Sequence, residues 1–302
     1  MQDSETLGGE PAAGRRLARA IAITNQKGGV GKTTTAINLS ACLASMGKKV
    51  LMVDMDPQGN ATSGVGIEKN NIEECVYELL VDGIDPLKVV KRGPVEGMDV
   101  IPSTLDLAAA EIELATELSR ENRLRSGIDP LRASYDFIII DCPPALGLLT
   151  INSLSAAAEA LVPIQCEFYA LEGLVFLLRT VQRVKQHVNP SLKIAGILLT
   201  MFDSRTNLSK DVVAEVRREY PGMTFQTVIP RTVRLSEAPG FGKPIILYEP
   251  SSKGAWAYME LAKEVVSSGE ERTGQGAGCA YRVGVDRGGA APGRDTGQGH
   301  QA

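Results

Sequence analysis

The sequence predicts an α/β fold: one domain built on a mostly parallel, twisted sheet with helices on both faces. Short β-branched runs alternate with longer segments of helical spacing along most of the 302 residues. A glycine-rich turn joins the first such run to the first helical segment. The chain is 43% hydrophobic and 23% charged, which is usual for a globular domain of this size.

The first half of the expected fold starts after a short arm. Residues 1–18 are polar and rich in glycine and alanine, so we expect them to be flexible. The run AIAIT at 20–24 predicts a strand, and residues 31–47 have helical spacing that stops at Gly47. The second strand is expected at 49–54. Further strands are expected at 98–102, 136–141, 160–164, 193–202 and 225–230, with helices at 105–118, 170–188 and 208–220.

The end of the chain changes character after its last amphipathic segment. Residues 252–266 predict a final helix, which closes a domain spanning 19–266. Residues 267–302 are rich in glycine, alanine and arginine, with almost no large apolar side chains. We expect this segment to be a disordered tail.

Composition excludes several classes of protein. No apolar run approaches the roughly 18 residues that a membrane span needs, and the N-terminus has no signal-peptide core. The net charge is −4, so nucleic acid could bind only through a local basic patch.

No CxxC pair is present, which favours a reducing cytoplasm over a disulfide framework or zinc site, and Cys142 and Cys166 have the apolar context of buried side chains. The five cysteines are Cys42, Cys75, Cys142, Cys166 and Cys279.

The loop NQKGGVGKTTT between the first strand and helix predicts a phosphate-binding site. Gly28, Gly29 and Gly31 allow the backbone around Val30 to curl and point its N–H groups inward. The helix N-terminus adds partial positive charge. The standard pattern GxxxxGK[ST] would place glycine where this chain has Gln26, so a strict match fails. A chance glycine turn is the alternative, but the preceding strand and the GKT at the helix start argue against it.

Three side chains of this loop indicate a nucleoside triphosphate with magnesium. Lys32 is placed to reach the β- and γ-phosphates, and the Thr33 hydroxyl to ligate Mg²⁺. Thr34 can add a contact to the α-phosphate. The sequence therefore predicts a P-loop NTPase domain that uses ATP and Mg²⁺.

The segment KGGVGKT at 27–33 resembles the deviant Walker A signature of the ParA/MinD class of ATPases. The segments VDMDPQGNATSG, IIIDCPPALGLLTIN, FYALEGL, GILLTMFDSRTNL, TVIPRTVRLSEAP and GKPIILYEPSSKGA resemble the Soj/ParA chromosome-partitioning branch. Together these segments lie within residues 20–266. The departures are the N-terminal arm, the long tail and single substitutions within motifs, none at a phosphate-contacting position.

The resemblance implies a role for the second lysine of the loop. In this class two ATP-bound subunits meet face to face, and the signature lysine reaches the partner's triphosphate. Lys32 would serve its own nucleotide, and Lys27 would bind and activate the neighbour's. A second cation offsets charge that moves during phosphoryl transfer. The alternative is that Lys27 is simply a solvated residue on the lip of the loop.

Aspartates end two of the expected strands. The run FIIID has the shape of a Walker B strand, whose Asp141 would hold Mg²⁺ through a water molecule. By resemblance, Asp56 orients or deprotonates the attacking water, and Asp54 lies near the magnesium or the loop. The alternative for each is an ordinary turn or capping residue.

The resemblance also places the adenine base late in the chain. Pro230 and Arg231 would line the base, together with Met201 or Phe202 after another strand. The alternative is that these side chains belong to the core.

Two arginines indicate a surface for DNA. In the Soj/ParA branch, arginines at the positions of Arg205 and Arg234 bind DNA without sequence preference, and they join into one patch only in the dimer. Lys210, Arg217 and Arg218 could widen it. No defensible helix-turn-helix is present, so sequence-specific reading is not expected. The alternative is that both arginines are merely solvated.

The resemblance implies an ATPase for chromosome or plasmid partitioning, located in the cytoplasm on the nucleoid. It would form an ATP-dependent homodimer, bind DNA non-specifically, and hydrolyse ATP slowly until a ParB-type partner stimulates it. A MinD-like membrane ATPase is the main alternative, but the tail lacks the amphipathic basic helix that it needs, so no stable membrane association is expected. A metabolic enzyme, such as an amide-forming synthetase, and a structural nucleotide-binding module are the others.

Overall fold

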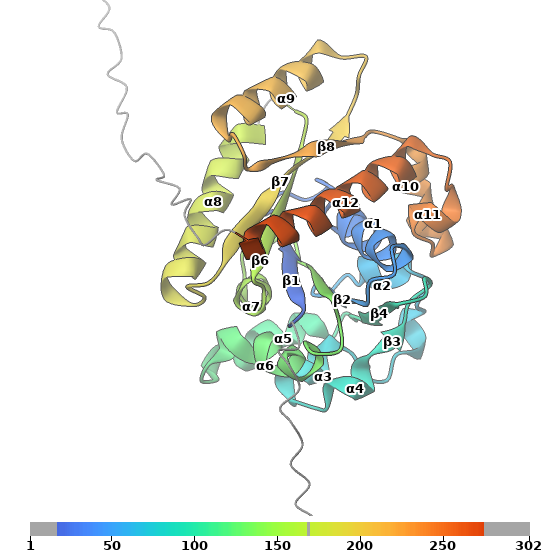
Figure 1. Cartoon of the computed structure of the whole chain (residues 1–302). Coiled ribbons are helices and arrows are strands. Elements are labelled where there is room, and N and C mark those ends of the chain that lie inside the picture. Colours follow the sequence, from blue (N-terminus) through green and yellow to red (C-terminus); the bar gives the residue numbers. More distant parts are fainter. Residues whose placement is uncertain (1–16, 168–169, 275–302) are drawn as a thin grey trace, which may run out of the picture.

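The fold is a single eight-stranded sheet covered by helices on both faces (Figure 1), as the sequence predicts. The computed structural model describes residues 17–167 and 170–274. The strand order is β3-β4-β2-β5-β1-β6-β7-β8, and all neighbours pair in parallel except β3 with β4. The strands are β1 (Arg19–Ile23), β2 (Val50–Asp54), β3 (Lys91–Arg92), β4 (Met98–Ile101), β5 (Phe137–Asp141), β6 (Glu159–Gln165), β7 (Lys193–Phe202) and β8 (Thr224–Pro230).

The central strands are apolar on both sides because helices cover both faces of a parallel sheet. In β5, Ile139 packs in one core and Ile138 and Ile140 pack in the other. β1 alternates in the same way with Ile21 and Ala22. The continuous apolar runs of the sequence therefore became buried strands.

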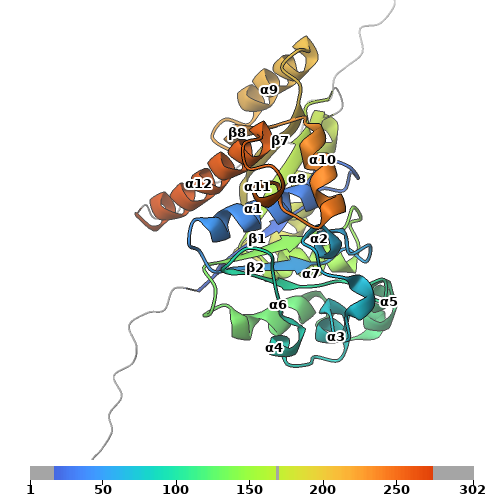
Figure 2. The same ribbon diagram turned by 90° about the vertical axis from the view of Figure 1, so that its right-hand side faces the viewer.

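The helices divide between the two faces, as Figures 1 and 2 show. One face is covered by α1 (Lys32–Ser45), α2 (Asn60–Gly64), α10 (Val233–Glu237), α11 (Ile245–Tyr248) and α12 (Lys253–Gly274). The other is covered by α3 (Val76–Val81), α4 (Pro86–Val89), α5 (Leu107–Glu113), α6 (Arg123–Ile128), α7 (Leu148–Ala156), α8 (Ala170–His187) and α9 (Asn207–Glu219). Short 3₁₀ turns lie at Lys69–Asn71, Leu114–Thr116, Arg120–Asn122, Asp129–Leu131 and Ala238–Phe241.

Two details differ from the sequence prediction. The antiparallel edge strand β3 is only two residues long, too short for a periodic pattern. The final helix, expected to stop at residue 266, continues through the first residues of the expected tail to Gly274. The Ser267 hydroxyl donates to the Glu264 carbonyl, and the Ser268 hydroxyl donates to the Val265 carbonyl and accepts from Arg19, which holds the helix onto the sheet. Residues 1–16 and 275–302, which make up most of the expected arm and tail, lie outside the described residues.

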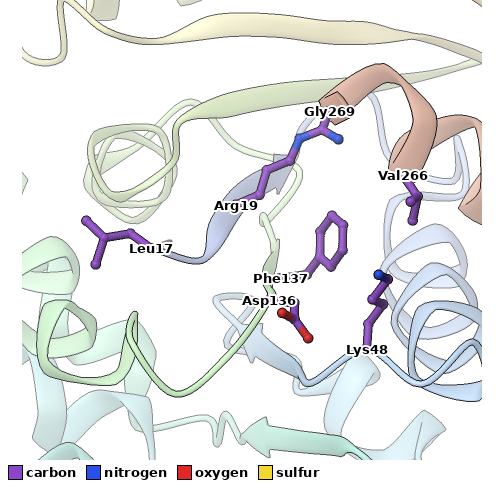
Figure 3. Close-up of a pocket in the computed structure, with 7 residues that line it drawn as sticks. All are labelled: Leu17, Arg19, Lys48, Asp136, Phe137, Val266 and Gly269. Atoms are coloured by element: carbon purple, nitrogen blue, oxygen red, sulfur yellow. The ribbon is translucent and has the colours of Figure 1, made fainter. Parts of the chain in front are cut away.

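A cavity of about 120 Å³ lies beside the contact between Arg19 and α12 (Figure 3). It opens at the amino ends of β1 and β5, where Arg19 and Phe137 begin the strands and Gly269 belongs to α12. The predicted phosphate loop follows the carboxyl end of β1. This cavity is therefore at the opposite edge of the sheet from the candidate site.

Candidate functional site

The carboxyl ends of the parallel strands bring the predicted site residues to one edge of the sheet. Asp54 and Asp141 end β2 and β5 and are paired in register, and Asp141 is paired with Ile23 on its other side. The predicted phosphate loop follows Ile23 directly. Ligand sites of parallel α/β sheets form at this edge.

The phosphate loop has the backbone that its glycines allow. Gly29 and Gly31 have φ of 75° and 90°, a left-handed conformation that a side chain would strain. Gly31 precedes α1 and provides no side-chain cap. The first N–H groups of α1 are therefore available to an anion at the mouth of the loop.

Residues that the sequence analysis did not single out hold this loop in place. The Gln165 amide donates to the Gly29 carbonyl at 2.8 Å, and the Thr200 hydroxyl donates to the Val30 carbonyl at 2.9 Å. Asn25 donates to the Pro163 carbonyl at 2.7 Å. A signal was present, because Gln165 and Thr200 are polar residues at the carboxyl ends of expected strands.

Lys32 lies inside the loop. Its side chain is buried, and its Nζ donates to the Lys27 carbonyl at 3.2 Å. Burial lowers the pKa of Lys32, while the charges of Asp141, Cys142 and Asp56 raise it. A cation in this poorly hydrated setting is a strong partner for a bound phosphate.

Lys27 points elsewhere, onto the end of β6. Its side chain is 54% exposed, and its Nζ lies 3.2 Å from both Gln165 Oε1 and Glu167 Oε2. The two lysines of the loop therefore occupy different surroundings within one chain: Lys32 lies in the cradle and Lys27 on its rim.

Asp54 is held by its own neighbours. Its carboxylate accepts from the Thr62 backbone N–H at 2.8 Å, the Thr62 hydroxyl at 2.7 Å and the Asp56 N–H at 3.1 Å. Thr62 Oγ1 in turn accepts from the Ser103 N–H. Burial is the main cause that raises the pKa of Asp54 to about 6, against these hydrogen bonds. These contacts indicate that Asp54 organises the end of β2.

Asp141 is buried and, within the described residues, both of its carboxylate oxygens lack a hydrogen-bond partner. Burial, followed by the charge of Asp54, raises the pKa of Asp141 well above its usual range, whereas Thr33 and Lys32 lower it. A buried carboxylate with open lone pairs, next to a threonine hydroxyl, suits a hard divalent cation. No group of three histidine, cysteine or acidic side chains in the described ranges could hold a metal. Such a cation would therefore need phosphate and water ligands as well.

Asp56 lies in the turn after β2. It is buried, its Oδ1 accepts from the Gln58 N–H at 2.9 Å, and its charge acts on both Lys32 and Asp141. The structure thus brings Lys32, Asp56 and Asp141 together around the mouth of the loop.

The residues expected at the adenine base share the same edge. Phe202 pairs in register with Pro230, and the Arg231 N–H donates to the Phe202 carbonyl at 2.9 Å. Met201 has a φ of 53°, unusual for a non-glycine residue, and its sulfur accepts from Gln165 at 3.1 Å. Gln165 therefore connects the predicted base-binding strand end to the phosphate loop.

Within one chain, each of the two predicted DNA-binding arginines carries its own counter-ion. Arg205 is 87% exposed in the loop after β7, where its Nε and Nη2 donate to Asp203 at 2.9 and 2.7 Å. These hydrogen bonds hold the pKa of Asp203 well below its usual range. Arg234, in α10, pairs with Glu237 at 2.9 Å. Of the residues expected to widen the patch, Arg218 pairs with Glu215 and Glu219, and Arg217 donates to the Gln226 carbonyl.

Four cysteines (Cys42, Cys75, Cys142 and Cys166) are free and buried, and Cys279 lies outside the described residues. For Cys142 and Cys166 this confirms the prediction of buried side chains. Among the helices that the structure describes, none is long and apolar enough to cross a bilayer.

Comparison with known proteins gives consistent relatives. A family model described as "AAA domain" matches residues 18–194. The chain is 58% identical to the sporulation initiation inhibitor protein Soj of Bacillus subtilis over 253 residues, covering 84% of this chain and 100% of Soj. It is 54% identical to the chromosome partitioning protein ParA of Myxococcus xanthus over 250 residues, covering 83% of this chain and 88% of ParA.

Solved structures share the fold. Cobyrinic acid a,c-diamide synthase of Mycobacterium smegmatis, bound to an ATP analogue and magnesium, matches with a TM-score of 0.75 and 39% identity, covering 84% of this chain and 96% of the other. The cell division ATPase MinD of Pyrococcus furiosus matches with a TM-score of 0.69 and 27% identity, covering 83% and 100%.

Proposed function

This chain belongs to the Soj/ParA family of chromosome-partitioning P-loop ATPases, and from that premise we propose that it is an ATP-dependent DNA-binding switch. With ATP and Mg²⁺ bound, two copies pair face to face and associate with DNA without reading its sequence. Slow hydrolysis of ATP, stimulated by a ParB-type partner, ends both the pairing of the two copies and their association with DNA. Its place in the cell is the nucleoid.

One observation carries this proposal: the two lysines of the loop lie in different places, so they cannot both bind the phosphates held in the cradle. Lys32 is buried in the cradle, while Lys27 is exposed on the rim and bonded to Glu167 and Gln165. Exposed ion pairs are weak, so a lysine on the rim can leave Glu167 and turn toward a ligand held by another copy. Pairing then depends on the triphosphate, because each copy contributes a cation to the other's nucleotide.

The positions of the side chains support the following proposed chemical roles. The backbone of Gly28–Gly31 and the amino end of α1 hold the phosphates, with Thr34 adding a polar contact. Lys32 offsets their charge. Thr33 and Asp141 would hold Mg²⁺, Asp141 through water, and the ion would supply further charge neutralisation at the phosphates. Asp56, buried beside Lys32, orients the attacking water or takes its proton.

The proposal also assigns contacts to the adenine base and to DNA. Pro230 and Arg231 line the adenine at the end of β8. Arg205 and Arg234 contact phosphates of DNA, and pairing of two copies doubles the number of such contacts. Doubling weak contacts raises affinity steeply, which suits a switch that must also release.

The test is the molar mass in solution by light scattering, with magnesium and a non-hydrolysable ATP analogue, together with nucleotide affinity. Wild type is expected to double in mass. Lys32→Ala is expected to lose nucleotide affinity, and Lys27→Ala to keep most of the affinity yet stay single. A wild-type protein that remains single when saturated with the analogue would refute the proposal.

A MinD-like membrane switch is the second candidate, supported by the likeness to the solved MinD structure. Pelleting with anionic vesicles separates the two, since ATP-dependent sedimentation with lipid but no binding to DNA would favour the membrane role. An amide-forming enzyme has weaker support, because the identity to the diamide synthase is 39% against 58% to Soj.

A further inference from the structure

Positive charge that is free to bind DNA is scarce where the sequence led us to expect it. Arg205 is bonded to Asp203, and Arg234 to Glu237. The whole chain has a net charge of −4. An acidic protein that holds DNA needs a local surface whose cations are not already neutralised.

Helix α8 provides such a surface. Its inner face packs into the core through Leu174, Leu177, Leu178, Val181 and Val184. Its outer face presents Arg179 and Arg183 to solvent, with Phe176 53% exposed beside them. Phe176, Arg179 and Arg183 follow at intervals of three and four residues, so they form one stripe along the helix.

This region of the chain is unusual in its charge. From residue 173 to residue 202 there are two arginines and two lysines and no aspartate or glutamate; the flanking acidic residues in the sequence are Glu172 and Asp203. None of Arg179, Arg183, Lys185 and Lys193 takes part in an ion pair within the described part of the chain. By contrast, the acidic residues Glu215 and Glu219 of α9 pair with Arg218.

We propose that the outer face of α8, built from Arg179 and Arg183, is a second surface that docks on the phosphate backbone of double-stranded DNA. This inference rests on the proposed function. Arg179 and Arg183 are about 6 Å apart along the helix axis, whereas DNA carries a negative charge for about every 1.7 Å of its axis. Each arginine therefore finds a phosphate without any need for base contacts.

The small exposed apolar area of α8 favours DNA over an anionic membrane. An anionic membrane would take a row of large apolar side chains beside the cations. The described part of the α8 surface offers only Val175 and Phe176. Figures 1 and 2 place α8 and α10 on opposite sides of the molecule, so this stripe contacts a different stretch of DNA from Arg234.

The experiment compares salt-dependent DNA binding of the full-length protein with an ATP analogue and magnesium. Arg179→Ala with Arg183→Ala is expected to lower DNA affinity at least about five-fold at physiological salt, and to reduce the slope of log affinity against log salt by about 2. Arg179→Lys with Arg183→Lys, which keeps both charges, should retain most of the affinity. The mass increase with nucleotide should be unchanged in both.

Lys49→Ala with Lys88→Ala removes the same charge from exposed positions outside α8 and serves as the matched control. An equal loss in this control, or an unchanged slope in the arginine variant, would overturn the inference. So would binding of the wild-type stripe to anionic vesicles in place of DNA. If DNA affinity falls only in the variant Arg205→Ala with Arg234→Ala, the proposed function is supported and the α8 proposal is refuted. If wild type fails to bind DNA, both fall.

Discussion

At the scale of single residues, identical side chains acquire different chemistry from their surroundings. Burial lowers the pKa of Lys32, while Lys27, five positions earlier, stays exposed beside Glu167. The same holds for the aspartates. Asp54 is satisfied by Thr62, whereas both oxygens of Asp141 have no hydrogen-bond partner among the described residues. A charged or polar side chain that is buried without partners, such as Asp141, is one that a bound ligand can stabilise.

Asp141→Asn should therefore stabilise the nucleotide-free protein while abolishing hydrolysis. Burial raises the folded pKa of Asp141 above its unfolded value, so the folded state holds the proton more tightly and its ionised form costs stability. The advantage of the variant in free energy of unfolding should be absent below about pH 4 and should grow as the pH rises toward the folded pKa of Asp141.

Urea unfolding of both proteins at pH 5 and pH 8, without nucleotide, measures this difference, and phosphate release measures hydrolysis. A variant that is less stable than wild type at pH 8 would mean that Asp141 has a stabilising partner.

At the scale of elements, the last helix depends on a contact made at the far edge of the sheet. Arg19, at the start of β1, bonds Glu159 of β6 at 2.6 and 3.1 Å and reaches the Val265 carbonyl and Ser268 of α12. The arginine and glutamate side chains are only 16% and 10% exposed. One cation thus joins two strands to the second half of a helix.

Arg19→Met keeps the apolar stem but leaves Glu159 without this partner. We expect a loss of about 1–3 kcal/mol in the free energy of unfolding, less than for a fully buried pair because the edge is partly hydrated. Hydrogen exchange should quicken first at the end of α12. Arg92→Met is the control: it breaks a pair whose arginine is 88% exposed, and should cost under about 1 kcal/mol. Equal losses in both variants would contradict the role of Arg19.

At the scale of the whole molecule, pairing of charges within the chain would limit the proposed affinity for DNA. Both arginines expected to bind DNA are paired within their own chain, Arg205 with Asp203 and Arg234 with Glu237. A phosphate must displace these carboxylates before it can bind. On the proposed function, such competition would keep the DNA-bound form releasable. On the α8 proposal it would also make the arginines of that helix more important, because they have no ion pair among the described residues.

Asp203→Asn with Glu237→Gln should therefore tighten DNA binding of the nucleotide-bound protein, by roughly two-fold to five-fold at physiological salt. The measurement is a titration of labelled duplex DNA with the ATP analogue present. Asp82→Asn with Glu96→Gln, which changes net charge equally at exposed sites elsewhere, should have a smaller effect. Weaker binding by the first pair would show that the carboxylates position the arginines.

The fold and the centre of the site could be predicted from the sequence because their signals are local. Apolar runs, helical spacing and the glycine loop placed β1, α1, β2 and β5 near their observed bounds. The two-residue strand β3 and the continuation of α12 could not be predicted, because the first has no period and the second depends on contact with Arg19.

By itself, the sequence determined the main strands and helices, and it predicted that Lys32 and Asp141 lie at the same edge of the sheet. Backbone propensity, side-chain period and the parallel sheet rule act over a few residues or one connection, and a sequence displays them directly. Only the tertiary structure decided that Gln165 and Thr200 hold the loop, that Glu167 pairs with Lys27, and that Arg179 and Arg183 of α8 have no ion pair in the described part of the chain. Lys27 and Gln165 are 138 positions apart, and the pairing of such distant groups depends on where the folded sheet brings them.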